Sequence, residues 1–165
     1  MLDLGSIRLA PGDVRHERPR VELEPIELAG QLYTVTPRRL EPRLTLQAAS
    51  GGLYLKLDFR AHVEGPCFRC LEPAELDLRV RASEYQSADP DADEELRSDY
   101  IAGGLLDLEA WVRDALVLAL PDKILDREDC AGLCPHCGVQ LESGVDHQCA
   151  EPERDTRWDK LRDLL

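Results

Sequence analysis

The chain has 165 residues, of which 43% are hydrophobic and 32% are charged, and its formal net charge at pH 7 is −13. This length fits one domain, and the hydrophobic fraction is large enough to fill a single core. All of the net negative charge lies in residues 83–165, where it repels polyphosphates, so direct RNA contact is excluded from that half and left to residues 1–82.

Membrane and export signals are missing from the sequence. No stretch is long and apolar enough to span a bilayer, which takes about 20 residues. The first residues, Met1 to Gly5, contain neither a basic region nor an apolar core, so we expect no signal peptide. We therefore expect a cytoplasmic protein with no membrane partner.

Alternating hydrophobic residues predict an antiparallel sheet in the first half of the chain. The clearest alternating runs are residues 40–48, 53–63 and 76–82. Because short connections join them, we expect a β-meander with one buried and one solvated face. Residues 21–35 alternate less regularly, and we expect one or two edge strands there.

An acidic segment and a helix are predicted next. Residues 86–100 have a composition that cannot bury enough apolar surface to order itself, which indicates an acidic linker. Asp107 is a good N-cap, and Pro121 ends the helix that follows it. The apolar stripe of this helix consists of Leu108, Trp111, Val112, Ala115, Leu116 and Ala119. We expect it to cover the apolar face of the sheet, with Trp111 in the core.

These elements predict an α+β fold, in which an antiparallel β-meander is packed by one or two helices and followed by a Cys-rich zinc-binding segment. We expect one compact domain with three regions. These are the sheet region at 1–85, the acidic linker at 86–100, and the helix plus zinc-binding segment at 101–165. A short terminal helix begins at Asp155, and its Trp158 is equally suited to the core and to anchoring a partner.

Six cysteines carry the chemistry of the sequence. They form two C-x-x-C pairs, Cys67 with Cys70 and Cys134 with Cys137, together with Cys130 and Cys149. A reducing cytoplasm disfavours disulfides. Zinc takes four soft ligands, and a two-residue spacer lets both thiolates of a pair reach one ion. The pattern therefore predicts bound Zn²⁺.

Two ligand sets are compatible with the spacing. The favoured set is local and consists of Cys130, Cys134, Cys137 and Cys149, because short loops close at little entropic cost. The alternative joins the two pairs, Cys67 and Cys70 with Cys134 and Cys137. His147 can replace either end of the local set. In both cases cysteine ligands close the shell, so we expect a structural site rather than a catalytic one.

Motifs of catalysis are missing. There is no Gly-rich phosphate loop, no Gly-x-Ser-x-Gly elbow and no His-Glu-x-x-His in the sequence. We therefore expect no enzymatic activity and no small-molecule substrate. The expected contacts with RNA or a protein partner are Arg69, Arg79, Arg81 and Trp158. The acidic second half suits a basic protein partner, or serves only solubility.

Four short segments, in this order, resemble a known family. They are Cys67-Phe68-Arg69-Cys70-Leu71-Glu72-Pro73, Asp107-Leu108 with Leu118-Ala119-Leu120-Pro121, Cys130-Ala131-Gly132-Leu133-Cys134-Pro135-His136-Cys137-Gly138, and Asp155-Thr156-Arg157-Trp158. They are similar to the C-x-R-C-L-x-P, D-L … L-A-L-P, C-x-G-L-C-P-x-C-G and D-P-R-W segments of the YceD family. Thr156 replaces the usual Pro, and His147-Gln148-Cys149 replaces a frequent Cys-x-Cys.

The resemblance implies a factor for large-subunit ribosomal RNA accumulation and processing during ribosome biogenesis, without enzymatic activity. Its partner would be pre-ribosomal RNA or a ribosomal or RNA-processing protein. One alternative is a zinc-containing protein-interaction module unrelated to ribosomes. The other is a metal-dependent hydrolase acting on RNA, which would need an open zinc position or a base near Cys67.

Overall fold

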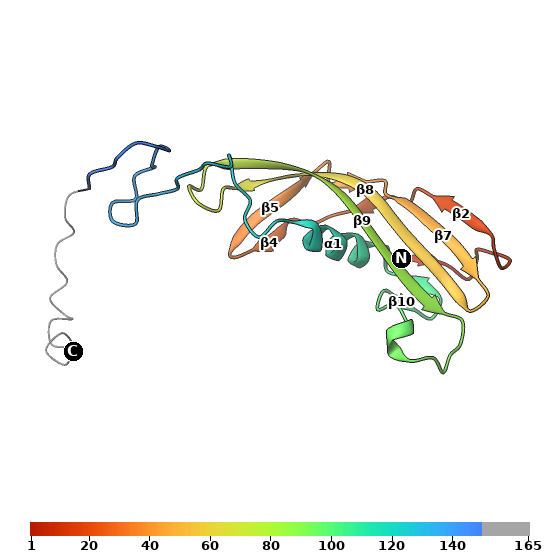
Figure 1. The fold of residues 1–165 in the computed structure, drawn as a ribbon. Coiled ribbons are helices and arrows are strands. Elements are labelled where there is room, and N and C mark those ends of the chain that lie inside the picture. The colour runs from red at the N-terminus through yellow and green to blue at the C-terminus, as the bar shows by residue number, and fades with distance from the viewer. Residues whose placement is uncertain (150–165) are drawn as a thin grey trace, which may run out of the picture.

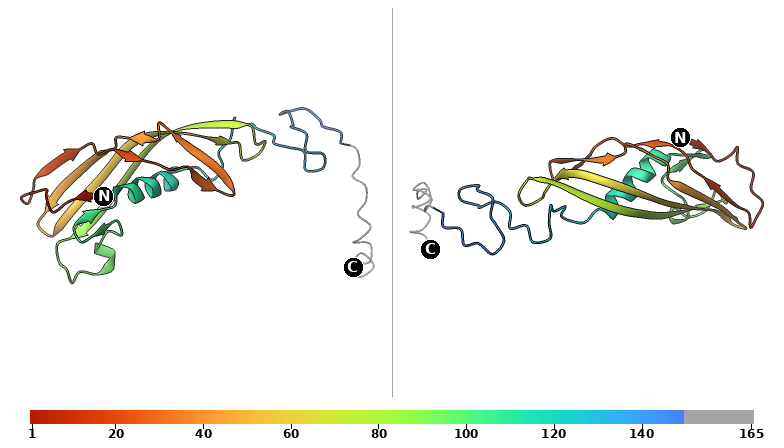
Figure 2. Two further views of the ribbon diagram at one scale, coloured as in Figure 1. Left: turned by 180° about the vertical axis from the view of Figure 1, so that it is seen from behind. Right: turned by 90° about the horizontal axis from the view of Figure 1, so that it is seen from above.

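The computed structural model describes residues 1–149, and its main feature is a six-stranded antiparallel sheet with a helix on one face (Figures 1 and 2). The strands run in the order β2-β7-β8-β5-β4, and β9 pairs with the other edge of β8. Their bounds are β2 Val14–Glu17, β4 Ile26–Leu28, β5 Gln31–Thr36, β7 Arg43–Ala49, β8 Gly52–Pro66 and β9 Pro73–Ser87.

Smaller pairings complete the fold. The strands β1 (Leu2–Asp3), β11 (Leu105–Leu106) and β10 (Ile101–Ala102) form a three-stranded sheet, and β3 (Val21–Glu22) pairs with β6 (Arg39–Leu40). A 3-10 helix, η1 (Glu94–Leu96), lies near the far end of β9.

The central strand β8 determines the layout of the large sheet. Along one edge it pairs with β9 over its whole length, from Gly52 opposite Ser87 to Pro66 opposite Pro73. Along the other edge it pairs first with β7 and then with β5. The inward side chains of β8 are the buried Leu55, Leu57, Phe59, Ala61 and Val63. The strands β8 and β9 thus form a long hairpin, and its closed end is the segment 67–72.

One α-helix, α1 (Leu108–Ala119), occurs within residues 1–149. The Asp107 carboxylate accepts a hydrogen bond from the Ala110 amide at 3.1 Å, which is the N-cap that the sequence predicts. The helix buries Leu108, Trp111, Val112, Ala115 and Leu116, and it packs against β9 and β3. The predicted combination of antiparallel strands and a covering helix is confirmed, with Trp111 only 1% exposed.

The segment predicted to be an acidic linker contains local structure. Strand β9 extends to Ser87, and η1 lies within the segment. Ser98 is buried, and its amide donates a hydrogen bond to the Gln86 side chain at 3.1 Å. The expectation that this composition stays without order is therefore wrong for part of it, because Ser98 and Gln86 attach the segment to the end of β9. The division of the chain into three regions stays a prediction.

Two further expectations concern the terminal helix and membrane-spanning segments. The short helix from Asp155, with Trp158, lies outside the described residues. In residues 1–149 no helix is both long enough and apolar enough to cross a bilayer.

Candidate functional site

The six cysteines gather in two clusters, one at the closed end of the β8–β9 hairpin and one beyond it in the C-terminal segment. The hairpin cluster consists of Cys67, Cys70, Asp126 and Cys130, and the C-terminal cluster consists of Cys134, Cys137, His147 and Cys149. Within each cluster the four ligand atoms all lie within 4.8 Å of one another. Each cluster thus presents three sulfur atoms and one harder ligand, and either can hold a metal ion.

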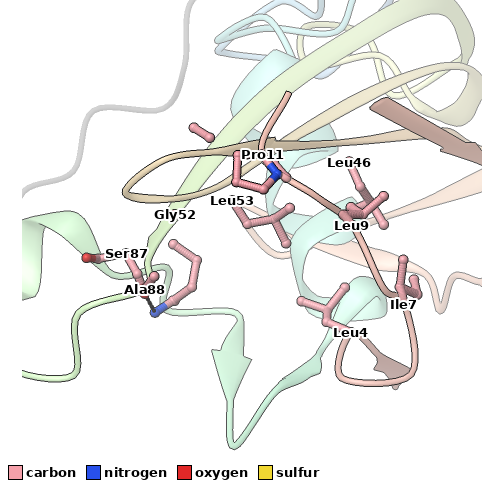
Figure 3. Close-up of a pocket in the computed structure, with 12 residues that line it drawn as sticks. Leu4, Ile7, Leu9, Pro11, Leu46, Gly52, Leu53, Ser87 and Ala88 are labelled. Carbon is pink, nitrogen blue, oxygen red and sulfur yellow. Dashed lines mark hydrogen bonds between the residues drawn. The ribbon is translucent and has the colours of Figure 1, made fainter. Parts of the chain in front are cut away.

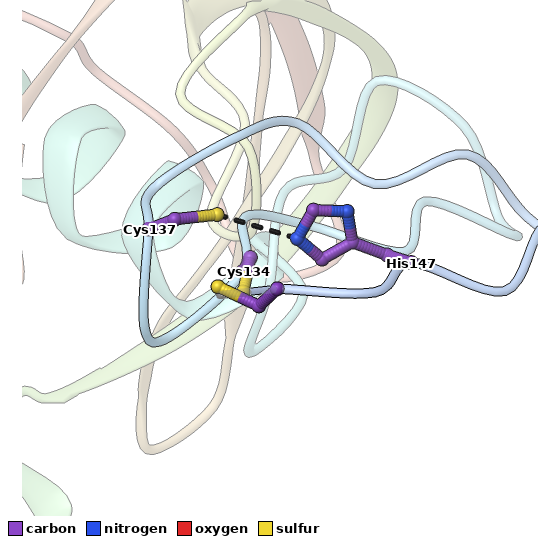
Figure 4. Close-up of side chains that lie close together, drawn as sticks. Cys134, Cys137 and His147 are labelled. Carbon is purple, nitrogen blue, oxygen red and sulfur yellow. Dashed lines mark hydrogen bonds between the residues drawn. The ribbon is translucent and has the colours of Figure 1, made fainter. Parts of the chain in front are cut away.

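The C-terminal cluster is built on the turn 134–138. Figure 4 shows the side chains of Cys134, Cys137 and His147 pointing toward one another. His147 Nε2 lies 3.3 Å from Cys137 Sγ. Cys134 is buried, whereas Cys137 and His147 are exposed. The cluster is therefore buried at Cys134 and exposed to solvent at Cys137 and His147.

Both C-x-x-C turns have the same backbone conformation. In the first, the Cys67 amide donates to Glu72 O at 2.7 Å and the Leu71 amide donates to Cys67 O at 3.0 Å. In the second, the Cys134 amide donates to Val139 O at 2.8 Å and the Gly138 amide donates to Cys134 O at 2.9 Å. The residue after the second cysteine has a positive φ in both turns, 65° at Leu71 and 72° at Gly138. The turn at the hairpin end, residues 67–71, thus has the same hydrogen bonds as the turn 134–138, although it lacks the Pro135 and Gly138 that mark the second turn in the sequence.

The hairpin cluster is more deeply buried. Cys67, Cys70 and Cys130 are 0%, 4% and 1% exposed. Cys67 Sγ lies 3.8 Å from Cys130 Sγ and 3.2 Å from Asp126 Oδ1, and Cys70 Sγ lies 3.7 Å from the same Asp126 oxygen.

Two hydrogen bonds hold the segment after α1 against the hairpin end. The Phe68 amide donates to Ile124 O at 2.7 Å, and Arg69 Nη1 donates to Cys130 O at 2.6 Å. These bonds align Asp126 and Cys130 with the cysteines of the hairpin.

The thiols differ in pKa because their surroundings differ. Amide N–H groups of Cys137 and His136 point at Cys134 and lower its pKa to about 6. Burial raises the pKa of Cys130 to about 12. A hydrogen bond that the Cys149 thiol donates to Cys137 raises the pKa of Cys149 to about 11. A bound cation would favour the thiolate form of all of them, since metal binding displaces the protons.

The structure divides the favoured ligand set. Cys134, Cys137 and Cys149 lie together as that set requires, but Cys130 lies with Cys67 and Cys70. Cys130 therefore lies apart from the rest of the local set, because the Arg69 and Phe68 hydrogen bonds hold its segment at the hairpin. Which residues bind metal stays a prediction. The alternative of four cysteines from the two pairs is not formed either. His147, a predicted substitute, takes the fourth position of the C-terminal cluster.

Sequence reasoning missed Asp126. Its signal was its position four residues before Cys130, in a half of the chain that is rich in carboxylates. Its contacts with Cys67 and Cys70 distinguish this carboxylate from its neighbours.

The predicted contact residues lie in two places. Arg69 is at the hairpin end, where one guanidinium nitrogen already donates to Cys130 O. Arg79 and Arg81 lie on β9 and project from the sheet face opposite α1, since their neighbour Val80 is buried. Trp158 lies outside the described residues.

Arg79 and Arg81 belong to a larger cationic surface. We call it the basic band, and its exposed residues are Arg43, Lys56, Arg60, Arg79 and Arg81. Register places Arg60 opposite Arg79, and Asp58 between Arg43 and Arg81. Asp58 Oδ2 lies 2.8 Å from Arg79 Nη2 and 3.8 Å from Arg81 Nε. Chiefly through its hydrogen bond from Arg79, the pKa of Asp58 is lowered.

An aromatic pair lies beside the basic band on the same face. Tyr54 and Tyr85 are opposite each other on β8 and β9, with ring centroids 4.7 Å apart. Tyr54 is 46% exposed. The face thus combines cations with an accessible aromatic ring, which is the composition of single-strand nucleic-acid platforms.

A pocket of about 310 Å³ lies at the end of the sheet away from the two cysteine clusters, where β8 begins and β9 ends (Figure 3). It is lined mainly by apolar side chains of the N-terminal segment and of β7 and β8, including Leu4, Leu9, Leu46 and Leu53. None of its lining residues is an acid, a base, a cysteine or a histidine; its polar side chains are Gln86 and Ser87.

Comparisons with known proteins identify relatives. A family model described as "Large ribosomal RNA subunit accumulation protein YceD" matches residues 55–165. Uncharacterized proteins of Mycobacterium tuberculosis and Mycobacterium bovis are each 31% identical over 175 residues, which cover 99% of this chain and 80% of the relative. An uncharacterized protein of Mycobacterium leprae is 33% identical over 105 residues, covering 60% of this chain and 46% of its own. No solved structure matches the chain.

Proposed function

Because the chain belongs to the YceD family of large ribosomal RNA subunit accumulation proteins, we propose that it supports large-subunit ribosomal RNA accumulation by binding and not by catalysis. It acts in the cytoplasm, where ribosomes are assembled, and its ligand is pre-ribosomal RNA or a protein that carries or processes that RNA.

The basic band is the observation that carries an RNA ligand. Within the band five exposed cations surround one paired carboxylate, Asp58, so this part of the face is net positive in a chain whose net charge is −13. The carboxylates Glu64, Glu75 and Asp77 lie on the same face of β8 and β9, beyond the band toward the hairpin end. Cations displace the counterions of RNA phosphates, and this release supplies most of the affinity for unspecific sites. Tyr54 and Tyr85 add rings on which unpaired bases stack. Arg79 and Arg81 lie at the centre of this interface.

The acidic half has a separate role in this proposal. Its carboxylates repel RNA and attract a basic partner, such as a ribosomal protein, so the two ligands of an assembly intermediate would bind to different parts of the chain. We propose that Arg69, which lies at the hairpin cluster, and Trp158, in the C-terminal part of the sequence, contact this protein partner.

The C-terminal cluster is proposed to hold a structural Zn²⁺ through Cys134, Cys137, Cys149 and His147. Three thiolates and one imidazole form a ligand set that is common for structural zinc. The ion would close the segment 134–149 into a fixed shape on which a partner can dock. With four protein ligands within 4.8 Å of one another, the set leaves no position for substrate, which argues against a hydrolase.

The second candidate function is an interaction module with no link to ribosomes. The acidic half alone would favour it, since that surface fits any basic protein. The basic band favours the ribosomal role instead.

Depletion of the protein from the cells that produce it tests the function. We expect large-subunit ribosomal RNA to fall relative to small-subunit ribosomal RNA, and a copy of the wild-type gene should restore it. Unchanged large-subunit RNA after complete depletion would refute the ribosomal role and leave the interaction module.

Salt dependence of RNA binding tests the interface. We expect Arg79→Gln and Arg81→Gln each to reduce the slope of log affinity against log salt by about 1, because each removes one phosphate contact. The matched control is Arg20→Gln, which removes an exposed arginine that pairs with Glu41 outside the basic band. Equal effects of all three substitutions would show that the band is no specific interface.

A further inference from the structure

We propose that the hairpin cluster binds a divalent cation of the zinc class, so that the chain binds two ions and not one. This site consists of Cys67, Cys70, Cys130 and Asp126. It is separate from the ion proposed at the C-terminal cluster, and it stands or falls independently of RNA binding.

The distances within the cluster are those of a coordination tetrahedron. Zinc–sulfur bonds of about 2.3 Å place neighbouring sulfur atoms about 3.8 Å apart, and replacing one sulfur by a carboxylate oxygen at about 2.0 Å shortens that edge to about 3.5 Å. Cys67 Sγ and Cys130 Sγ are 3.8 Å apart, and the Asp126 oxygen is 3.2 Å and 3.7 Å from the two hairpin sulfurs.

The backbone supplies a second, independent observation. The 67–71 turn repeats the hydrogen bonds and the positive φ of the 134–138 turn, although Leu71 has a side chain where Gly138 has none. A left-handed leucine costs energy and persists only where its surroundings require it. The Arg69 amide also points at Cys67 Sγ, at 3.4 Å, as amides do toward metal-bound thiolates.

Burial argues against a set of idle thiols. Three cysteines that are at most 4% exposed face a carboxylate whose side chain is only 16% exposed. Without a cation, the negatively charged Asp126 carboxylate has the thiols of Cys67 and Cys70 as neighbours on its buried side. A divalent ion would neutralise Asp126 and the thiolates together.

The proposed ion would join distant parts of the chain. Cys67 and Cys130 are 63 residues apart in the sequence, and they belong to the hairpin end and to the segment after α1. Because Cys134 follows four residues after Cys130, this ion would also fix where the C-terminal cluster lies relative to the sheet.

The test is the zinc content of the purified full-length protein and its variants, measured after dialysis against a weak chelator. We expect wild type to retain two equivalents, and Cys70→Ser and Cys137→Ser to retain one each, because each substitution removes a ligand from a different cluster. One equivalent in wild type that survives Cys70→Ser would overturn the proposal. The proposal would also be overturned if wild type held one equivalent and each of the two substitutions removed it, since that result indicates a single shared site.

A conservative pair of variants keeps the test informative if a cysteine variant fails to fold. Asp126 and Asp129 both pair with Arg127, at 3.9 Å and 3.6 Å, but only Asp126 belongs to the cluster. Asp126→Asn should release one of the two equivalents at a lower chelator concentration than wild type, by a factor of ten or more. Asp129→Asn should behave as wild type. Identical release curves for the two variants, or a Cys67–Cys130 disulfide in the intact mass, would refute the site.

Discussion

Leu71 occupies a backbone conformation that suits glycine. Its φ is 65°, and L-residues reach this left-handed region at a cost of about 1–2 kcal/mol. Its side chain is 55% exposed and contributes little burial in return. Gly138, at the matching position of the other turn, has nothing within 4 Å of where a Cβ would lie.

This comparison predicts opposite effects of two substitutions. In the metal-loaded protein, Leu71→Gly should raise the free energy of unfolding by about 0.5–1 kcal/mol, because the strain is relieved and part of the gain is lost to glycine's freedom in the unfolded chain. Gly138→Leu should lower it by about 1–2 kcal/mol. Urea unfolding measures both. A destabilising Leu71→Gly would mean that the leucine side chain has a contact partner of its own.

His62 lies among carboxylates at the end of the sheet nearest the hairpin cluster. Its Nδ1 is 2.8 Å from Asp77 on β9, and its Nε2 is 3.8 Å from Glu75 on β9 and 3.7 Å from Glu64 on β8. The hydrogen bond with Asp77 is the main reason that the pKa of His62 is raised, and burial opposes it.

The raised pKa gives a signed pH dependence. The protonated imidazole favours the folded state, so its contribution is complete below the unfolded pKa of about 6.5 and disappears as the pH rises through the higher folded value. An NMR titration should give a His62 pKa above the ordinary value of about 6.5, and Asp77→Asn should bring it down. A His62 midpoint unchanged by Asp77→Asn would contradict this assignment.

Elements with a local signal were predicted well. The alternation in residues 53–63 predicts β8, and the apolar stripe from Leu108 predicts α1, because neighbouring residues alone fix these patterns. The full extent of β8 could not be predicted. Gly65 and Pro66 read as a break, yet both pair with β9. A Cβ at Gly65 would lie 2.2 Å from the Tyr33 ring, so the glycine is there to let β5 pack closely against the strand.

The grouping of the cysteines had no local signal. Closeness in sequence favours Cys130 with Cys134, whereas contacts across 63 residues place it with Cys67. Loop-closure entropy, on which the sequence argument depended, changes only slowly with length. A few hydrogen bonds from Arg69 and Phe68 therefore outweigh it.

The helix offers a matched test of packing. Leu116 lies on the buried face of α1 and is 0% exposed, whereas Leu118, two residues later, is 85% exposed. Leu116→Ala should lower the free energy of unfolding by about 2–5 kcal/mol, because it leaves a cavity between helix and sheet. Leu118→Ala should change it by less than about 0.5 kcal/mol. Similar losses for both in urea titrations would show that the helix does not cover the sheet as described.

At the scale of the whole molecule, charge and sulfur are separated. The basic band lies on part of the sheet face away from α1, while the two clusters extend from the hairpin end into the acidic half. Figure 1 shows the segment after α1 running past the closed end of the β8–β9 hairpin. The proposed function assigns RNA to the sheet face and a protein partner to the segment of the C-terminal cluster. If both proposed ions bind, the shape at that end depends on how the six cysteines share them.

X-ray absorption at the zinc edge of the purified, metal-loaded protein tests that sharing most directly. Each cluster offers three sulfurs and one oxygen or nitrogen. We therefore expect an average of about three sulfur neighbours at ~2.3 Å and about one lighter neighbour at ~2.0 Å. A shell of four sulfurs would instead indicate an all-cysteine site, and a shell dominated by oxygen and nitrogen would mean that the cysteines do not hold the metal. Either result would contradict the account.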